Sequence, residues 1–174
     1  IQRNPTLPWE WSRISENENL PMRVVKANLD KPWDYIALSL NPGLTIEDVE
    51  LLGAWRWSYH YLSSHPHIKI GDILERPNRD WNYSFLSANS NVTYDDVINY
   101  PEIKFDFREL SRNANITMTT VKEHPDEEWD WQGLSMNESI GWPEVTENEN
   151  RPWDWDNLSA RLPLSENILH HFEG

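Results

Sequence analysis

Aromatic residues recur in this chain at a fixed interval of 24 residues, and no other feature of the sequence constrains the fold as much. The first aromatic column consists of Trp9, Trp33, Trp57, Trp81, Phe105, Trp129 and Trp153. The second, two residues later, consists of Trp11, Tyr35, Tyr59, Tyr83, Phe107, Trp131 and Trp155. The units follow one another without an insertion or a deletion. A fixed period of about 20–50 residues is the signature of a solenoid or repeat array.

Three further columns complete the unit. The leucine column, three residues after the second aromatic, consists of Ile14, Leu38, Leu62, Leu86, Leu110, Leu134 and Leu158, and a serine follows each of them. The asparagine column, two residues after the serine, consists of Asn17, Asn41, Asn89, Asn113 and Asn137, with His65 and Arg161 as exceptions. We expect the leucines to form one buried row. We expect each serine to bond to a backbone carbonyl near a helix end, which explains this column better than nucleophilic catalysis does.

Each unit is predicted to contain two short helices. The first covers residues 45–52 in the third unit, where Thr45 is a good N-cap and Glu47 and Asp48 suit the positive end of a helix. The second is predicted to begin at a column of caps and to carry a proline in its first turn. That cap column consists of Thr6, Asp30, Asn78, Glu102, Asp126 and Asn150, and the prolines are Pro8, Pro32 and Pro152. The asparagine column is predicted to end this helix, since Asn tolerates the left-handed conformation.

The predicted fold is therefore an all-α, right-handed-type solenoid of about seven two-helix repeats. The repeats cover residues 4–20, 21–44, 45–68, 69–92, 93–116, 117–140 and 141–164 of a single repeat domain, 1–174, and 165–174 forms a terminal helix. One observation fits this poorly. On a helix, positions 33 and 35 would lie on opposite sides, yet both aromatic columns are complete. An extended Trp-Asp-Trp segment would solve this, and the alternative is an α/β solenoid like that of leucine-rich repeats.

The repeat also resembles a known family. The strings KPWDYIALSLNPGLT at 31–45 and RPWDWDNLS at 151–159 are similar to the tandem tryptophan-rich repeats of giant nucleocytoplasmic large DNA viruses. The resemblance covers essentially the whole chain, although Arg56, Ser58 and Phe105 depart from the pattern. It implies a viral source and a repeat architecture, and a location in the virion or in the cytoplasm of the infected host. It implies no biochemical activity.

Composition narrows the classes of function. Acidic residues outnumber basic ones by 29 to 15, for a net charge of −14, which argues against binding to nucleic acid. There is no cysteine, no apolar run long enough to span a membrane and no signal peptide, so we expect no secretion and no membrane contact. No column combines a nucleophile, a base and an orienting group, so we expect no enzyme and no cofactor.

Two other polar groups have ordinary explanations. The histidines at 60, 65 and 67, and the pair at 170 and 171, lack an acidic partner at ligand spacing, and solvated or capping roles are expected rather than a metal site. The acidic column consists of Glu10, Asp34, Asp106, Asp130 and Asp154. It forms either a stripe for a basic partner or, as we prefer, a set of first-turn residues that favour the helix dipole.

Function is then expected in the variable columns. Positions 36, 37 and 40 should share one face of the second helix, and the middle units place aromatic residues and arginines there, which are typical of interface hot spots. The candidate partner-binding residues are Trp55, His60, Tyr61, Phe85, Arg108 and Arg112. Two hypotheses follow. The chain is a scaffold for interaction with a host or viral protein, or it is a structural, virion-associated component that assembles end to end or with capsid proteins.

Overall fold

The computed structural model describes residues 7–172, and the regular secondary structure in this part of the chain is entirely helical. One helix of each repeat begins at the second aromatic column: α1 (Trp11–Ser15), α3 (Tyr35–Leu38), α5 (Tyr59–Leu62), α7 (Tyr83–Ser87), α9 (Phe107–Arg112), α11 (Trp131–Met136) and α13 (Trp155–Arg161). These alternate with α2 (Met22–Lys26), α4 (Ile46–Leu51), α6 (Ile70–Glu75), α8 (Tyr94–Asn99), α10 (Met118–Glu123), α12 (Trp142–Thr146) and α14 (Glu166–Phe172). A 3-10 helix, η1 (Ala54–Arg56), interrupts the third repeat. The predicted all-α solenoid of two-helix repeats is confirmed.

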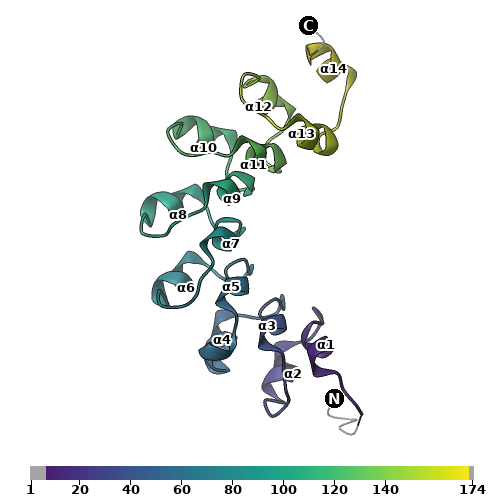
Figure 1. The fold of residues 1–174 in the computed structure, drawn as a ribbon, viewed down its shortest axis with the longest axis vertical. Helices are drawn as coiled ribbons and strands as arrows, with labels where there is room; N and C mark the ends of the chain where they lie inside the picture. Colours follow the sequence, from purple (N-terminus) through teal and green to yellow (C-terminus); the bar gives the residue numbers. More distant parts are fainter. Residues whose placement is uncertain (1–6, 173–174) are drawn as a thin grey trace. The chain divides into compact units, whose positions relative to one another are not determined.

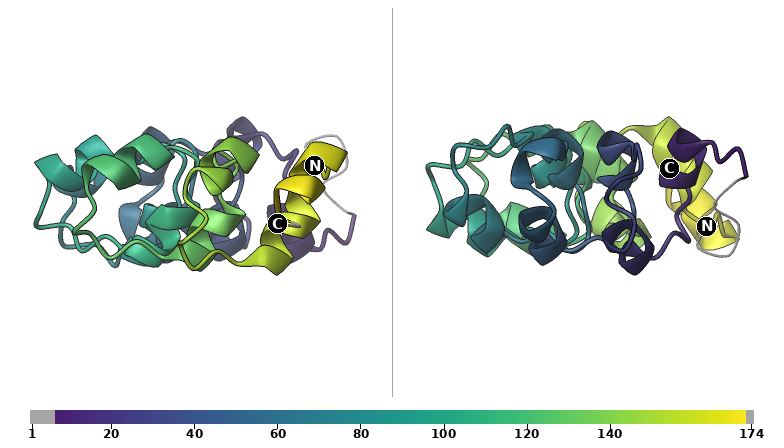
Figure 2. Two further views of the ribbon diagram at one scale, coloured as in Figure 1. Left: turned by 90° about the horizontal axis from the view of Figure 1, so that it is seen from above. Right: turned by 90° about the horizontal axis from the view of Figure 1, so that it is seen from below.

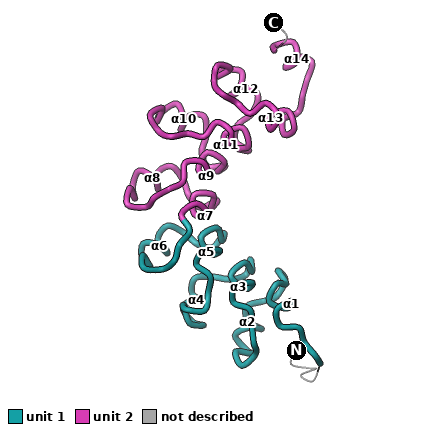
Figure 3. Tube along the Cα trace, viewed as in Figure 1, with its two compact units in different colours: residues 1–82 teal, residues 83–174 magenta. Residues whose placement is uncertain are grey.

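The chain divides into two compact units, residues 1–82 and 83–174. In unit 1, α1, α3 and α5 form one row and α2, α4 and α6 a second (Figure 1). In unit 2, α7, α9, α11 and α13 form one row, and α8, α10 and α12 the other. End-on views show the rows as two layers (Figure 2). The boundary lies just before α7 (Figure 3), although the repeat of the sequence continues across it in register.

The core of each unit lies between its two rows of helices. The leucine column supplies one side of it, and Leu38, Leu62, Leu86, Leu110, Leu134 and Leu158 are all at most 1% exposed. The other row contributes the buried side chains of Val25, Val49, Ile73, Val121 and Val145. The predicted burial of the leucines is confirmed within each unit, whereas Ile14 of the same column is half-buried.

The predicted start of the second helix is wrong. The segment around the first aromatic is extended, with Asp34 at φ −85° and ψ 100°, and the helix begins only at Tyr35. Pro32 therefore precedes the helix instead of lying in its first turn, and Pro8 and Pro152 do the same in their repeats. Because the chain is extended at Asp34 and helical from Tyr35, the two aromatic columns do not lie on opposite sides of one helix. This explains how both columns can be complete. No strand forms in residues 7–172, so the leucine-rich-repeat alternative is wrong as well.

The N-cap belongs to the acidic column and not to the predicted cap column, of which Thr6 lies outside the described residues. One carboxylate oxygen of Asp34 accepts hydrogen bonds from the backbone N–H groups of Ile36 and Ala37, at 2.9 and 3.1 Å. Asp106 and Asp130 each accept from two backbone N–H groups of α9 and α11, and Asp154 accepts from one in α13. These carboxylates satisfy N–H groups that have no partner inside the helix, which explains the aspartates of the acidic column without a basic partner. Glu10 makes no such bond at α1.

The other row of helices begins as predicted. The Thr45 hydroxyl accepts from the backbone N–H of Asp48, and Thr117 does the same for Thr120 in α10. In α8, the Asp96 carboxylate accepts from both the backbone N–H and the hydroxyl of Thr93, at 2.8 and 2.9 Å. Among residues 7–172, none of the helices is long and apolar enough to cross a membrane.

Candidate interaction surface

The serine column joins each repeat to the next. Six of the seven serine hydroxyls, all but that of Ser159, donate to the carbonyl four residues earlier, as predicted, at 2.7 Å in the case of Ser39 and Tyr35. The same oxygen accepts from a backbone N–H that lies 19 residues later, in the next repeat, at 2.8–3.0 Å. The acceptors of this second bond are Ser15, Ser39, Ser63, Ser87, Ser111 and Ser135.

The asparagine column forms a second link between repeats, and its predicted left-handed backbone is wrong. No residue other than glycine has a positive φ among those described, and Asn113 is at φ −69°. Its side-chain amide instead donates to the carbonyls of Ser87, Asn89 and Val92 in the preceding repeat. The side-chain amide of Asn137 donates in the same way to carbonyls of its own preceding repeat, those of Ser111, Asn113 and Ile116. Arg161 replaces the asparagine of the last repeat and donates to the carbonyls of Ser135 and Ile140.

The two aromatic columns meet edge to face across the junctions between repeats. Ring centroids lie 4.8–5.3 Å apart in the pairs Trp11–Trp33, Tyr35–Trp57, Tyr59–Trp81, Phe107–Trp129 and Trp131–Trp153. The edge-to-face arrangement is one of those that pairs of aromatic rings prefer. The side chains of the constant columns are thus occupied with contacts between repeats.

Trp55 is the most prominent variable residue of unit 1, because 78% of its side chain is exposed. It lies in η1, the 3-10 helix that follows Gly53. Gly53 has a φ of 97°. In two other repeats an arginine occupies the Trp55 position, and its guanidinium covers the second aromatic of the preceding repeat. These pairs are Arg79 over Tyr59, at 5.3 Å from the ring centroid, and Arg151 over Trp131, at 5.1 Å.

Arg56 takes over this covering role in the third repeat. Its guanidinium lies 5.2 Å from the ring centroid of Tyr35 and donates to the Tyr35 hydroxyl at 2.9 Å. It also lies 4.9 Å from the Trp55 ring. The 3-10 turn thus moves the covering cation forward by one residue and leaves Trp55 facing outward, stacked on that cation.

This turn leaves a hydrogen bond unmade in the core. In regular repeats the indole N–H of the first aromatic donates to the carbonyl five residues earlier, at 2.8–2.9 Å, as Trp33, Trp81, Trp129 and Trp153 do. The indole N–H of Trp57 is buried and has no partner. A buried donor without an acceptor costs about 1–3 kcal/mol. The turn that exposes Trp55 is therefore less favourable for folding than its regular counterparts.

The other candidates of unit 1 lie on α5. His60 is exposed, and its Nδ1 is 3.1 Å from the side-chain nitrogen of Asn82. Tyr61 is half-buried, and its ring meets that of His60 edge to face at 5.3 Å. His65 is buried, so the solvated role is wrong for it, and its two ring nitrogens bond to backbone groups as a capping side chain does.

The candidates of unit 2 lie on α7 and α9. Phe85 is 37% exposed, and the mostly exposed Arg108 has its Nε 4.0 Å from a carboxylate oxygen of Asp130. Arg112 is half-buried, pairs with Glu109 at 3.3 Å, and keeps a buried Nε without a partner.

The predicted binding face on the second helix is not uniformly exposed. Ile36 and Leu40 are exposed, but the intervening column packs partly against the preceding repeat. Gly133 belongs to that column, and a Cβ there would lie 2.9 Å from the backbone oxygen of Arg108. Sequence reasoning placed position 51, with 47 and 50, on a competing face of the first helix, and it overlooked the contacts of Arg56 with Tyr35 and Trp55. Leu51 is an available signal, because its column otherwise holds Ala27, Glu75, Asn99, Glu123 and Glu147.

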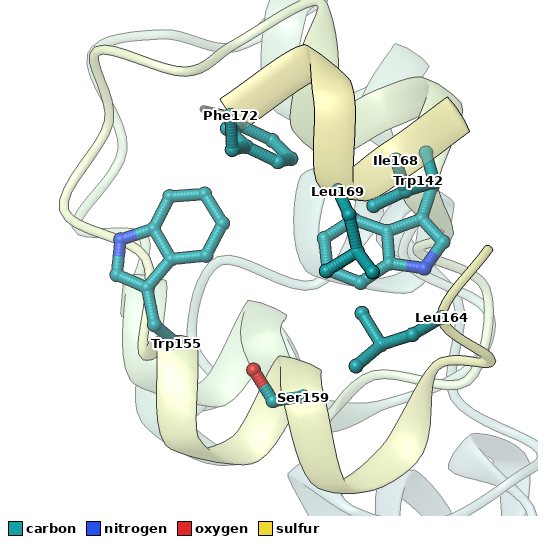
Figure 4. Close-up of a pocket in the computed structure, with 7 residues that line it drawn as sticks. All are labelled: Trp142, Trp155, Ser159, Leu164, Ile168, Leu169 and Phe172. Carbon is teal, nitrogen blue, oxygen red and sulfur yellow. The ribbon is translucent and has the colours of Figure 1, made fainter. Parts of the chain in front are cut away.

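A second feature that the sequence did not indicate is an apolar cavity of about 350 Å³ in unit 2, beneath α14. Figure 4 shows its walls: Trp142, Trp155, Leu164, Ile168, Leu169 and Phe172, with the Ser159 hydroxyl at its floor. No three His, Asp or Glu side chains within residues 7–172 are placed to hold a metal ion.

Comparison of the chain with protein-family models, curated proteins and solved structures found no match.

Proposed function

We propose that this chain is a non-enzymatic repeat scaffold that binds a protein partner through the Trp55 surface, formed by Trp55, Arg56, Tyr35 and Leu51 of unit 1. The observation that carries the proposal is the exposure of Trp55 on a turn that departs from the repeat, requires a positive φ and leaves the Trp57 indole N–H without an acceptor. Local strain of this kind is typical of functional sites. Tryptophan, tyrosine and arginine are also the residues most enriched in interface hot spots.

The chemistry of this surface indicates the kind of partner. Trp55 and Leu51, both more than 70% exposed, offer apolar area, and the Arg56 guanidinium offers donors in a fixed orientation. The net charge of −14 opposes nucleic acid and anionic membranes and favours a partner whose contact surface is apolar with a basic rim.

We include the remaining candidates as secondary contacts. His60 and Tyr61 belong to unit 1, and Phe85, Arg108 and Arg112 belong to unit 2. The resemblance of the strings at 31–45 and 151–159 to giant-virus repeats supports a viral source. The same resemblance supports a partner protein of the host or of the virus, which the chain would bind in the virion or in the cytoplasm of the infected cell.

Site-directed photocrosslinking tests this proposal. A photoreactive amino acid replaces Trp55 in one protein and Ile98, an apolar residue of α8 that is 54% exposed, in the control. After irradiation in host-cell lysate, position 55 should yield a discrete crosslinked protein that position 98 does not. The same product should disappear when Arg56→Ala is added. The same products from both positions, or no effect of Arg56→Ala, would remove the Trp55 surface from consideration.

A further inference from the structure

Another cavity of unit 2, of about 170 Å³, lies between α10 and the turn that follows α12. It shares no residue with the cavity beneath α14. Its lining includes the buried side chains of Met118 and Val121 and the exposed side chains of Lys122 and Arg151. This space, which we call the Met118 cavity, is therefore apolar on its inner side and reaches solvent beside two cations.

The preceding repeat fills the corresponding space with its own side chain. Tyr94 of α8 is buried, and its ring centroid lies 4.3 Å from that of His124. Its hydroxyl donates to a carboxylate oxygen of Glu127 at 2.9 Å. The counterparts of these three residues, 24 positions later, all line the Met118 cavity: Met118, Asn148 and Arg151. Since methionine has no ring, the cavity is the space in which the preceding repeat holds a tyrosine ring.

The polar partner of the ring is reversed between the two repeats. Glu127 accepts a hydrogen bond from the Tyr94 hydroxyl, whereas Arg151, which stands in the place of Glu127, can only donate. The Arg151 guanidinium lies 5.1 Å from the ring centroid of Trp131, which also lines the cavity, and this contact orients it. A ring bound beside Met118 therefore needs a hydrogen-bond acceptor where tyrosine carries a donor.

The charges around the cavity favour an anionic acceptor. Its charged lining residues are Lys122, Glu127 and Arg151, so positive charge is in local excess although the chain carries a net charge of −14. The Lys122 ammonium is paired with Glu147 at 3.0 Å, and the Glu127 carboxylate is engaged by the Tyr94 hydroxyl. The Arg151 guanidinium is then the group best placed to bind a carboxylate, with which arginine forms paired hydrogen bonds.

The size of the cavity limits the ligand to a single ring. An apolar cavity of about 150 Å³ accommodates benzene, whereas drug-sized ligands occupy pockets of about 300 Å³ or more. We propose that the Met118 cavity binds a small aromatic carboxylate, with its ring in the place that the Tyr94 ring takes one repeat earlier and its carboxylate on Arg151. This site lies within unit 2 and does not depend on the Trp55 surface.

Titration of the whole chain with sodium benzoate, followed by nuclear magnetic resonance, tests the proposal. The indole N–H resonances of Trp129 and Trp131, which line the cavity, should shift and reach saturation. Acetate, which has the charge without the ring, and phenol, which has the ring without the charge, should cause smaller shifts at the same concentrations. Met118→Tyr places a phenol ring in the cavity as Tyr94 does one repeat earlier, so it should abolish the benzoate shifts. Met136→Tyr, the same substitution at an exposed residue of α11 that does not line the cavity, is the control and should leave them unchanged.

A charge reversal tests the carboxylate contact separately. Arg151→Glu restores the acceptor that Glu127 supplies one repeat earlier. It should weaken benzoate binding at least about tenfold and make phenol the tighter ligand, because phenol can donate to the new carboxylate. Lys104→Glu changes the net charge by the same amount at an exposed residue that does not line the cavity, and it should alter neither affinity.

Four results would overturn the proposal. The first is an absence of saturable shifts when benzoate is added to the wild type, and the second is an equal response to acetate. The third is benzoate binding retained in a Met118→Tyr protein whose far-ultraviolet circular dichroism shows that it is folded. The fourth is an Arg151→Glu protein that still prefers benzoate to phenol, which would show that the guanidinium does not bind the carboxylate.

Discussion

At the scale of the residue, His65 shows how strictly a position in the asparagine column is defined. The His65 Nε2 lies 2.9 Å from the carbonyl oxygen of Asn41, and its Nδ1 accepts from the backbone N–H of His67 at 3.2 Å. Asn41 makes the same two kinds of bond, donating to the Leu20 carbonyl and accepting from the N–H of Gly43. Only a neutral imidazole with its proton on Nε2 reproduces this pattern.

We expect His65 to make folding sensitive to mild acid. Burial lowers the pKa of His65 below its ordinary value near 6.5, so at slightly acidic pH the unfolded chain binds a proton that the folded chain does not. The free energy of unfolding should therefore fall as the pH decreases from about 7 through the unfolded pKa, and level off below the folded pKa. His65→Asn keeps the donor and the acceptor without the titration. Urea unfolding at a series of pH values should show a smaller acid loss in this variant, and parallel curves would contradict the explanation.

The outcome for individual columns depends on where their partners lie. The serine bond to Tyr35 and the burial of Leu38 were predictable, because helical geometry and apolar character are local properties. The role of Asn113 was not, because its three acceptors lie 21–26 residues earlier in the chain. A single sequence shows that such a column is constant from repeat to repeat, but not which atoms of the preceding repeat it meets.

At the scale of the element, the helices are only four to seven residues long, too short to be stable alone. Caps and packing on neighbouring repeats hold them instead. The sequence therefore predicts that two helices exist in each repeat, but not where the second begins. Asp30 and Asp34 are both plausible caps, and only the contacts of Trp33 with its neighbours select Asp34.

Two helical glycines should respond in opposite ways to the same substitution. Alanine at Gly133 would place its Cβ 2.9 Å from the Arg108 backbone oxygen and 2.9 Å from the Ser111 Cβ, so Gly133→Ala should destabilise unit 2 by about 1–3 kcal/mol. At Gly71 in α6 a Cβ meets nothing within 4 Å. Gly71→Ala should stabilise by about 0.5–1 kcal/mol through helix propensity alone. Chemical denaturation of both variants measures this, and a stabilising Gly133→Ala would show that α9 and α11 are less tightly packed than described.

At the scale of the whole molecule, cooperativity should depend on the asparagine links. Asn113→Ala leaves buried carbonyls without their donor, at a cost of about 1–3 kcal/mol for each group that water does not reach. It should also separate the unfolding transitions seen by tryptophan fluorescence and by far-ultraviolet circular dichroism, because it weakens the coupling between repeats. Asn115→Ala is the control: Asn115 bonds to the same Val92 carbonyl but is exposed. Coincident transitions in both variants would assign the coupling to apolar packing.

Two larger features lay beyond sequence reasoning for a common reason. The turn at Gly53 departs from the repeat, and the cavity beneath α14 depends on how this helix packs, although the sequence does predict a helix at residues 165–174. The period informs only about what recurs. The sequence does show where the departures occur, since Gly53 and Arg56 replace residues that are often proline elsewhere, and Arg161 replaces an asparagine. Their conformations depend on contacts that no other repeat makes.

The junction bonds join residues 19, 21, 24 or 26 positions apart, and this spacing has a consequence for the gene. Recombination that adds or removes 24 codons rejoins the chain with every donor again opposite its acceptor, wherever the breakpoints fall. A change that is not a multiple of 24 codons alters the spacing of every pair that spans it. The number of repeats can therefore vary between related genes without a new contact having to evolve, whereas the length of a single repeat is fixed.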